Sequence, residues 1–116
     1  MKQEAFTMSL LFDTYGALLT EKQQTYFDLY YNQALSLAEI AEQEGISRQG
    51  VHDAISRSEA LLASFERVTG CVAREQKLRH ALAAITAEAQ PLLQAGDPAT
   101  RQGAQRILAA VDSLKE

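Results

Sequence analysis

Apolar residues recur at every third or fourth position through most of the chain, which is the spacing of one face of an α-helix. The first such stretch predicts a helix over residues 4–15, with Gly16 just past its end. Its apolar stripe consists of Met8, Leu11, Phe12, Tyr15 and Leu18. No segment shows the sustained alternation of a strand, and β-branched residues are sparse. The pattern therefore predicts an all-α protein.

A second helix is expected to begin at Thr20, because Thr20 and Gln23 have the spacing of a capping box. Tyr26, Phe27 and Tyr30 then form its inward stripe. Together with Tyr31 they place four aromatic rings in a short span, which suggests either base stacking or core packing. Their helical spacing favours core packing.

The third helix has an unusually complete start signal at Ser36. Ser36 can cap the helix while Glu39 reaches back to it, and Leu35 and Ile40 have the spacing of a hydrophobic staple. Leu37, Ile40 and Ala41 are expected to face inward. Gly45 then supplies the left-handed residue that a tight turn needs.

A fourth helix follows at once, with Ser47 as its cap and Ile46 and Val51 in staple positions. Its inward stripe is predicted to be Val51, Ile55, Ser58, Leu62 and Phe65. The opposite face carries Arg48, Gln49, His52, Asp53, Ser56 and Arg57. A helix, a glycine turn and a second helix with a polar outer face are typical of a helix-turn-helix without a wing, whose second helix enters the major groove.

Those six residues are the candidate DNA-binding site. Near the start of such a helix, Arg can address guanine, Gln can address adenine, and the helix N-terminus favours phosphate. Taken one by one, the same residues also fit an ordinary solvated helix face. It is the combination of two caps, a glycine turn and a polar face that favours a helix-turn-helix.

The segment LTEKQQTYFDLYYNQALSLAEIAEQEGISRQGVHDAISRSEALL resembles the fourth region of bacterial sigma factors, which recognises the −35 promoter element. From Met8 to about Leu62 the chain resembles more specifically the YlxM family of small helix-turn-helix proteins, in which LLFDxYGxLLTEKQ, LYYN, SLxEIA and SRQxVxDxIxR recur in that order. The resemblance covers about half of the chain.

The resemblance implies a DNA-binding regulator with a link to the signal recognition particle, because the YlxM gene typically lies beside that for the particle's protein subunit. This chain departs from the family pattern at the candidate site. Position 52 is often aromatic and position 56 often basic, whereas here they are His52 and Ser56. Gly50 stands in place of a better helix former, at a cost of about 1 kcal/mol.

Charge argues against tight DNA binding. The chain has 11 Lys and Arg against 15 Asp and Glu, which gives a net charge of −4. Residues 20–67 hold four of the cations and eight of the anions, so the helix-turn-helix segment carries the whole deficit. Nucleic-acid-binding domains usually show the opposite balance.

The C-terminal part is predicted to be a helical extension. We expect a helix-turn-helix domain over residues 1–67 and a packing or dimerisation segment over residues 68–116, with Gly70 breaking or kinking the long fourth helix. Two amphipathic helices follow, with Pro91 kinking or ending the first and Gly96, Asp97 and Pro98 starting the second. Their stripes are Cys71, Leu78, Leu82, Ile85, Ala89 and Leu92, then Ala104, Ile107, Leu108, Val111 and Leu114. These apolar stripes need a surface to pack against, which is either the first domain or a second subunit. We favour a homodimer, because twofold dimers are the commonest oligomers.

The remaining chemistry is sparse. Cys71 is the single cysteine and is expected to be a small buried residue rather than a nucleophile. His52 and His80 lack plausible nucleophilic or metal-binding partners, and no glycine-rich phosphate loop occurs. We therefore expect neither an enzyme nor a cofactor. No leader-like segment or membrane-length apolar run occurs, so a cytoplasmic protein without membrane insertion is expected.

Two hypotheses about function follow. In the first, a dimer inserts the segment from Arg48 to Arg57 into duplex DNA and regulates transcription. In the second, the helix-turn-helix is a scaffold whose acidic surface or C-terminal helices bind a basic protein, such as the GTPase of the signal recognition particle or its receptor. The motif favours the first hypothesis, and the net charge favours the second.

Overall fold

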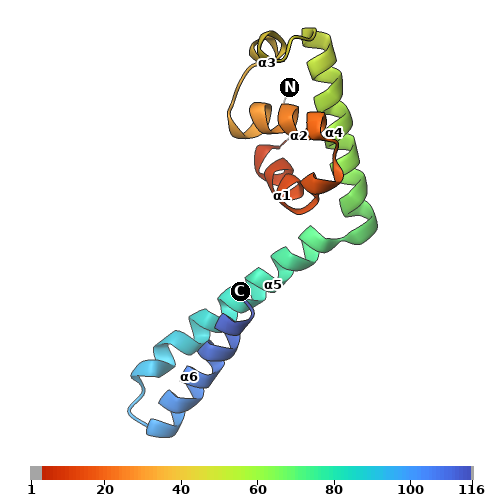
Figure 1. Cartoon of the computed structure of the whole chain (residues 1–116). Helices are drawn as coiled ribbons and strands as arrows, with labels where there is room; N and C mark the ends of the chain where they lie inside the picture. Colours follow the sequence, from red (N-terminus) through yellow and green to blue (C-terminus); the bar gives the residue numbers. More distant parts are fainter. Residues whose placement is uncertain (1–3, 116) are drawn as a thin grey trace. The chain divides into compact units, whose positions relative to one another are not determined.

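The computed structural model describes residues 4–115, and this range contains helices and no strand. The prediction of an all-α protein is therefore confirmed. The elements are α1 Ala5–Tyr15, a 3₁₀ turn Gly16–Leu18, α2 Glu21–Phe27, a π-helical turn Asp28–Asn32, α3 Leu37–Glu44, α4 Arg48–Thr69, α5 Cys71–Ala89, a 3₁₀ turn Gln90–Gln94 and α6 Pro98–Ser113 (Figure 1). They form two units that divide between Val72 and Ala73, whereas the sequence suggested a division between residues 67 and 68.

The start signals read from the sequence are present as hydrogen bonds. Thr20 Oγ1 accepts from the Gln23 backbone N–H at 3.2 Å, and Gln23 Oε1 accepts from the Thr20 N–H at 2.9 Å. Ser36 and Glu39 make the same reciprocal pair at 3.0 and 2.8 Å. Because these caps use residues only three positions apart, they specify locally at which residue α2 and α3 begin.

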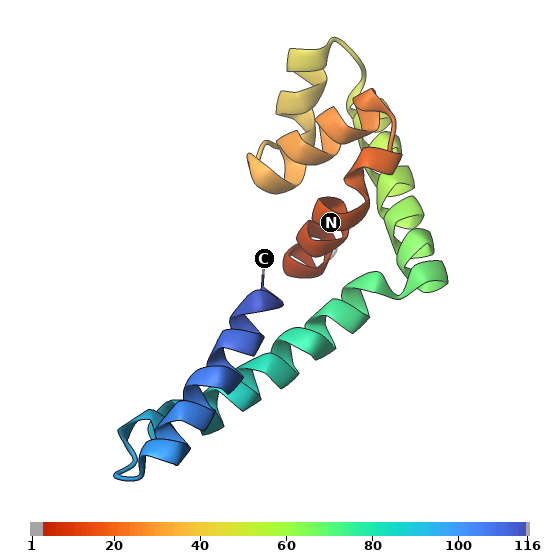
Figure 2. The same ribbon diagram turned by 60° about the horizontal axis from the view of Figure 1, so that its bottom comes forward.

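The first unit packs α1, α2 and α3 along one side of α4 (Figures 1 and 2). Its core has two parts, both of which include buried residues of α4. One part lies between α1, α2 and the C-terminal half of α4, and its buried residues are Met8, Leu11, Tyr15, Leu19, Phe27 and Leu62. The other lies between the π-helical turn, α3 and the N-terminal half of α4, and its buried residues are Tyr26, Leu29, Ile40, Ala41, Val51 and Ile55.

Aromatic packing joins the two parts of this core. Phe27 is fully buried and stacks on Phe12 at a centroid distance of 4.7 Å and on Tyr31 at 4.5 Å. Tyr31 packs against both parts, and its hydroxyl donates to the Glu59 carboxylate. Core packing rather than base stacking therefore accounts for these two rings.

Two short turns shift the helical register that the sequence suggested. In the π-helical turn the Gln33 N–H bonds to the Asp28 carbonyl, five residues back, at 3.1 Å. The extra residue buries Leu29 and leaves Tyr30 only half-buried at the edge of the core. Leu18 was predicted in the first apolar stripe, but it is 66% exposed because the 3₁₀ turn after α1 directs the next residue, Leu19, inward instead.

The end of α4 is tied to the start of α5 by one carboxylate. Glu66 Oε1 accepts from the Tyr15 hydroxyl at 2.5 Å and from the Val72 N–H at 3.0 Å. Gly70 ends α4 in the left-handed region at φ +64°, as the sequence predicted. The prediction that Cys71 is buried is wrong: Val72 packs against the core, so the preceding side chain lies exposed.

The second unit is a hairpin of α5 and α6, which lie side by side in both views (Figures 1 and 2). Its buried apolar residues are Leu82, Ala89, Ala104 and Val111. Pro91 lies at the start of the 3₁₀ turn that follows α5, and Asp97 caps α6 by accepting from the Thr100 N–H at 2.9 Å. The predicted ends of both helices are confirmed.

Phe27 offers a direct test of the core. We expect Phe27→Ala to lower the free energy of unfolding by about 3–5 kcal/mol, because the ring is fully buried and stacked on two others. Phe6→Ala removes the same group from a side chain that is 67% exposed, so it should change stability by less than about 0.5 kcal/mol. Urea unfolding followed by helical circular dichroism measures both, and equal losses would contradict this description of the core.

Candidate nucleic-acid interface

The turn between α3 and α4 depends on the backbone of Gly45. Gly45 lies in the left-handed region at φ +71°, ψ +31°, and its N–H bonds to the Ala41 carbonyl at 3.0 Å. The next N–H, of Ile46, bonds to the same carbonyl at 3.1 Å. These bonds close α3, and two residues later α4 begins. The turn predicted from the sequence is thus confirmed.

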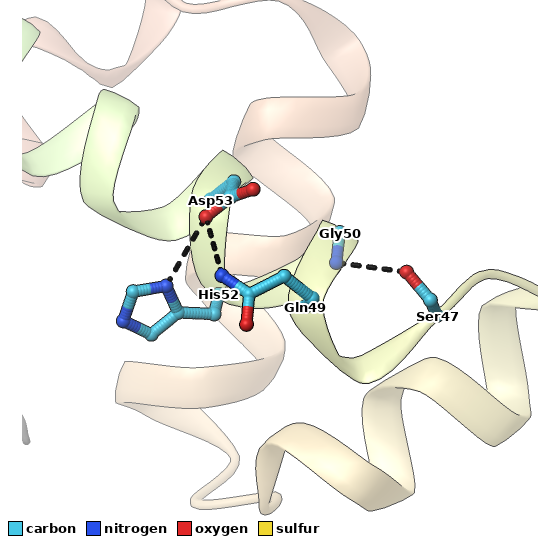
Figure 3. Close-up of polar contacts among 5 residues, drawn as sticks. All are labelled: Ser47, Gln49, Gly50, His52 and Asp53. Carbon is cyan, nitrogen blue, oxygen red and sulfur yellow. Dashed lines mark hydrogen bonds and ion pairs between the residues drawn. The ribbon is translucent and has the colours of Figure 1, made fainter.

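α4 begins at Arg48 with Ser47 as its cap. Ser47 Oγ accepts from the Gly50 N–H at 2.9 Å (Figure 3). Glycine has a low helix propensity, but the cap explains its presence at position 50. A Cβ atom there would lie only 3.1 Å from Ser47 Oγ and would crowd the cap. The close cap that glycine allows therefore offsets part of the propensity cost.

The structure brings the six candidate DNA-binding residues together on one exposed face of α4. Each of them is exposed, and they are Arg48, Gln49, His52, Asp53, Ser56 and Arg57. The opposite face is buried through Val51, Ile55, Ser58 and Leu62. Ser58 fits this apolar stripe because its hydroxyl donates to the Ala54 carbonyl at 2.9 Å. Helical periodicity alone predicted this division.

Three of the six residues form a small polar network. Gln49 Nε2 donates to Asp53 Oδ1 at 2.9 Å, one helical turn away, and His52 Nδ1 lies 3.3 Å from the same oxygen (Figure 3). An amide that reads adenine needs both its donor and its acceptor. The bond to Asp53 uses one of the two N–H donors of the Gln49 amide and holds the amide in one orientation along the helix.

Asp53 places a stable negative charge at the centre of this face. Hydrogen bonding from the Gln49 amide lowers the pKa of the Asp53 carboxyl, and the His52 ring and the Arg57 charge lower it further. The carboxyl is therefore ionised at neutral pH. It repels phosphate and can accept a hydrogen bond from the amino group of cytosine.

Sequence reasoning missed one feature beside the site. Tyr30, Leu37 and Glu59 border a shallow depression that His52 and Ser56 also line. The spacing of Tyr30 indicated only a core residue, because the π-helical turn that moves it to this edge leaves no clear sequence signal. Glu59 lies three residues after Ser56, so its proximity follows from helical spacing.

A helix, a left-handed glycine turn and a second helix that buries one face and exposes a polar one define a helix-turn-helix protein. A family model described as "Putative helix-turn-helix protein, YlxM / p13 like" matches residues 2–95. The chain belongs to this family, UPF0122. The resemblance noted from the residue motifs is thereby confirmed, and it extends beyond them.

Curated relatives cover most of the chain as well. A UPF0122 protein of Symbiobacterium thermophilum is 45% identical over 104 residues, which are 90% of this chain and 91% of that protein. A UPF0122 protein of Halalkalibacterium halodurans is 39% identical over 99% of this chain and the full length of its own. A shorter match, to a UPF0122 protein of Clostridium kluyveri, is 56% identical over 55% of this chain and 58% of that protein.

Two properties of the described residues bear on other kinds of site. Within residues 4–115, no group of three or more His, Cys, Asp or Glu side chains is arranged to hold a metal ion. None of the helices in this range combines the length and apolar character that crossing a bilayer requires.

Two glycines allow the turn to be tested separately from steric crowding. Gly45 and Gly96 both have open space where a Cβ atom would lie, but only Gly45 has a positive φ. We expect Gly45→Ala to destabilise the protein by about 1–2 kcal/mol, the cost of a left-handed alanine. Gly96→Ala should be neutral or slightly stabilising. Thermal unfolding of the two variants decides, and an unaffected Gly45→Ala would show that the turn does not need glycine.

Proposed function

We propose that this protein binds duplex DNA with the first half of α4 and acts as a DNA-binding regulator in the cytoplasm. The observation that carries this proposal is the exposed polar face of α4, which follows a capped glycine turn and lies opposite a buried stripe. Membership of a helix-turn-helix family supports the same function.

In this proposal the start of α4 enters the major groove. Arg48, the first residue of the helix, is placed to reach guanine or a phosphate beside the helix N-terminus. Arg57 lies nine residues later on the same exposed face and suits a phosphate farther along the groove. Ser56 and His52, between them, supply short polar groups that can bond to either bases or phosphates.

The charge of the unit limits the affinity that this surface can provide. Residues 1–72 contain five Lys and Arg against ten Asp and Glu. Each phosphate contact by a cation releases counterions and strengthens binding, while nearby carboxylates oppose it. We therefore expect binding to mixed-sequence DNA that is weak and that weakens further as salt rises, in proportion to the few phosphate contacts, with tighter binding reserved for a sequence that the α4 side chains match.

Arg48→Ala tests the proposed contact. We expect the variant to bind a labelled duplex at least about tenfold more weakly than the wild type, with a salt dependence reduced by about one phosphate contact. Arg67→Ala removes the same charge from the last turn of the same helix and should bind as the wild type does. Fluorescence anisotropy at two salt concentrations measures all three proteins.

Two results of this titration would contradict the proposal. One is that the wild type shows no binding to mixed-sequence DNA even in low salt. The other is that Arg48→Ala and Arg67→Ala weaken binding equally, because only net charge would then matter and the face of α4 would not be the contact.

Asp53 provides a test of opposite sign. Asp53→Asn removes the negative charge from the centre of the face and withdraws the anionic acceptor that holds Gln49. We expect it to tighten binding to mixed-sequence DNA about tenfold, since a carboxylate no longer repels the phosphates. Glu42→Gln neutralises an exposed anion of α3 and should have a smaller effect. Weaker binding by Asp53→Asn would indicate that the carboxylate makes a favourable contact with a base.

The acidic surface supports a second candidate function, which is binding of a basic protein. The resemblance to YlxM proteins suggests a component of the signal recognition particle, its GTPase or the receptor as that partner. Arg48→Glu separates the two candidates. DNA binding should collapse in this variant, whereas binding of a basic protein through the acidic face should survive.

A further inference from the structure

The α5–α6 hairpin leaves a regular row of large apolar side chains exposed. Their exposed fractions range from 43 to 60%, and they are Leu78, Ile85 and Leu92 on one side of the hairpin and Ile107 and Leu114 on the other. Successive members of the row lie seven residues apart on each side. We call these five residues the outer row.

A second row with the same seven-residue spacing is already buried between the two helices. It consists of Leu82 and Ala89 from α5 and Ala104 and Val111 from α6. Each helix thus carries a three-four repeat of which the hairpin uses only half. A coiled-coil repeat with one buried row and one exposed row is what half of a four-helix bundle presents.

The outer row is interrupted by two hollows that can receive side chains. One hollow of about 330 Å³ is lined by Ile85, Leu92 and Ile107 together with Ala84, Glu88 and Ala89. The other, of about 480 Å³, lies at the opposite end of the row beside Leu78 and Leu114. Alternating ridges and hollows along a helix pair are suited to knobs-into-holes packing.

We infer that the outer row binds the outer row of a second copy of this chain, so that two hairpins form an antiparallel four-helix bundle. In this arrangement the twofold axis is perpendicular to the helices and passes near Ile85 and Ile107. α5 of one copy then runs antiparallel to α5 of the other. The same patch serves both copies, as a twofold interface requires.

Charge selects the antiparallel arrangement. The open end of the hairpin, residues 73–80 and 107–115, has four cations and two anions. The loop end, residues 81–106, has two cations and two anions and is neutral. An antiparallel dimer keeps the two positive open ends apart and places each against a neutral loop end, whereas a parallel dimer would place the two positive ends together.

This inference rests on the hairpin and not on the proposed DNA binding, so each can fail separately. If both hold, the dimer carries two copies of α4. Twofold helix-turn-helix dimers bind paired half-sites related by the same symmetry. The dimer would then double the small number of cations that each chain offers to DNA.

Sedimentation equilibrium of the full chain tests the dimer. We expect a mass twice that of the 12.8 kDa chain. Ile85→Glu should raise the dissociation constant of the dimer more than about 100-fold, because it places two carboxylates side by side in an apolar contact. Ala87→Glu adds the same charge to an exposed position away from the outer row and should leave the mass unchanged. A monomeric wild type, or equal effects of the two variants, would overturn the inference.

Cross-linking tests the arrangement even if Ile85→Glu disturbs the hairpin. With the native thiol removed by Cys71→Ser, Ile85→Cys should form a disulfide with its own counterpart on oxidation, since the two positions face each other across the axis. Ala87→Cys in the same background should stay monomeric on a non-reducing gel. A dimer in which Ala87→Cys cross-links and Ile85→Cys does not would overturn the antiparallel arrangement. Failure of both in a monomeric protein would indicate that the row binds the first unit or a different protein.

Discussion

The first unit depends on a single buried stripe along α4. Val51, Leu62 and Ser58 have no exposed surface, and Ile55 has only 3%. Through this stripe one helix closes both parts of the core, one against α1 and α2 and the other against the π-helical turn and α3. Short helices such as the seven-residue α2 and the eight-residue α3 are not stable alone in water, so their order depends on this shared surface.

The same stripe orients the candidate interface. Because side chains on a helix are spaced 100° apart, burying Val51 and Ile55 directs His52, Asp53 and Ser56 outward. The turn at Gly45 and the cap at Ser47 then determine where this face begins. The position of the polar face is thus a consequence of core packing. Its chemistry is set independently, by side chains that contribute little to stability and can vary without loss of the fold.

The features that the sequence predicted correctly are local ones. Capping boxes, the left-handed Gly45 and the proline-containing helix start at Asp97 each involve residues a few positions apart. The errors arise where distant contacts decide. Leu18 had the right spacing, but it ends a 3₁₀ turn and Leu19 is the residue that packs against Phe27 and Leu62. Cys71 is exposed because Val72 packs against the core and Glu66 is held by the Tyr15 hydroxyl. At the candidate site, periodicity predicted which side chains are exposed. It did not predict that the Gln49 amide donates a hydrogen bond to Asp53.

The distribution of charge bears on both exposed surfaces discussed above, the polar face of α4 and the outer row of the hairpin. The anions are concentrated in the unit that carries α4, where hydrogen bonds from Gln49 and His52 lower the pKa of the Asp53 carboxyl further below neutral pH. A protein with this balance does not accumulate on DNA through net charge, because phosphate attraction requires an excess of cations. In the proposed function, specific contacts would therefore have to supply the affinity, and linking two weak sites would raise the overall affinity without any new contact. The outer row of the hairpin, through the dimer inferred above, would provide that link.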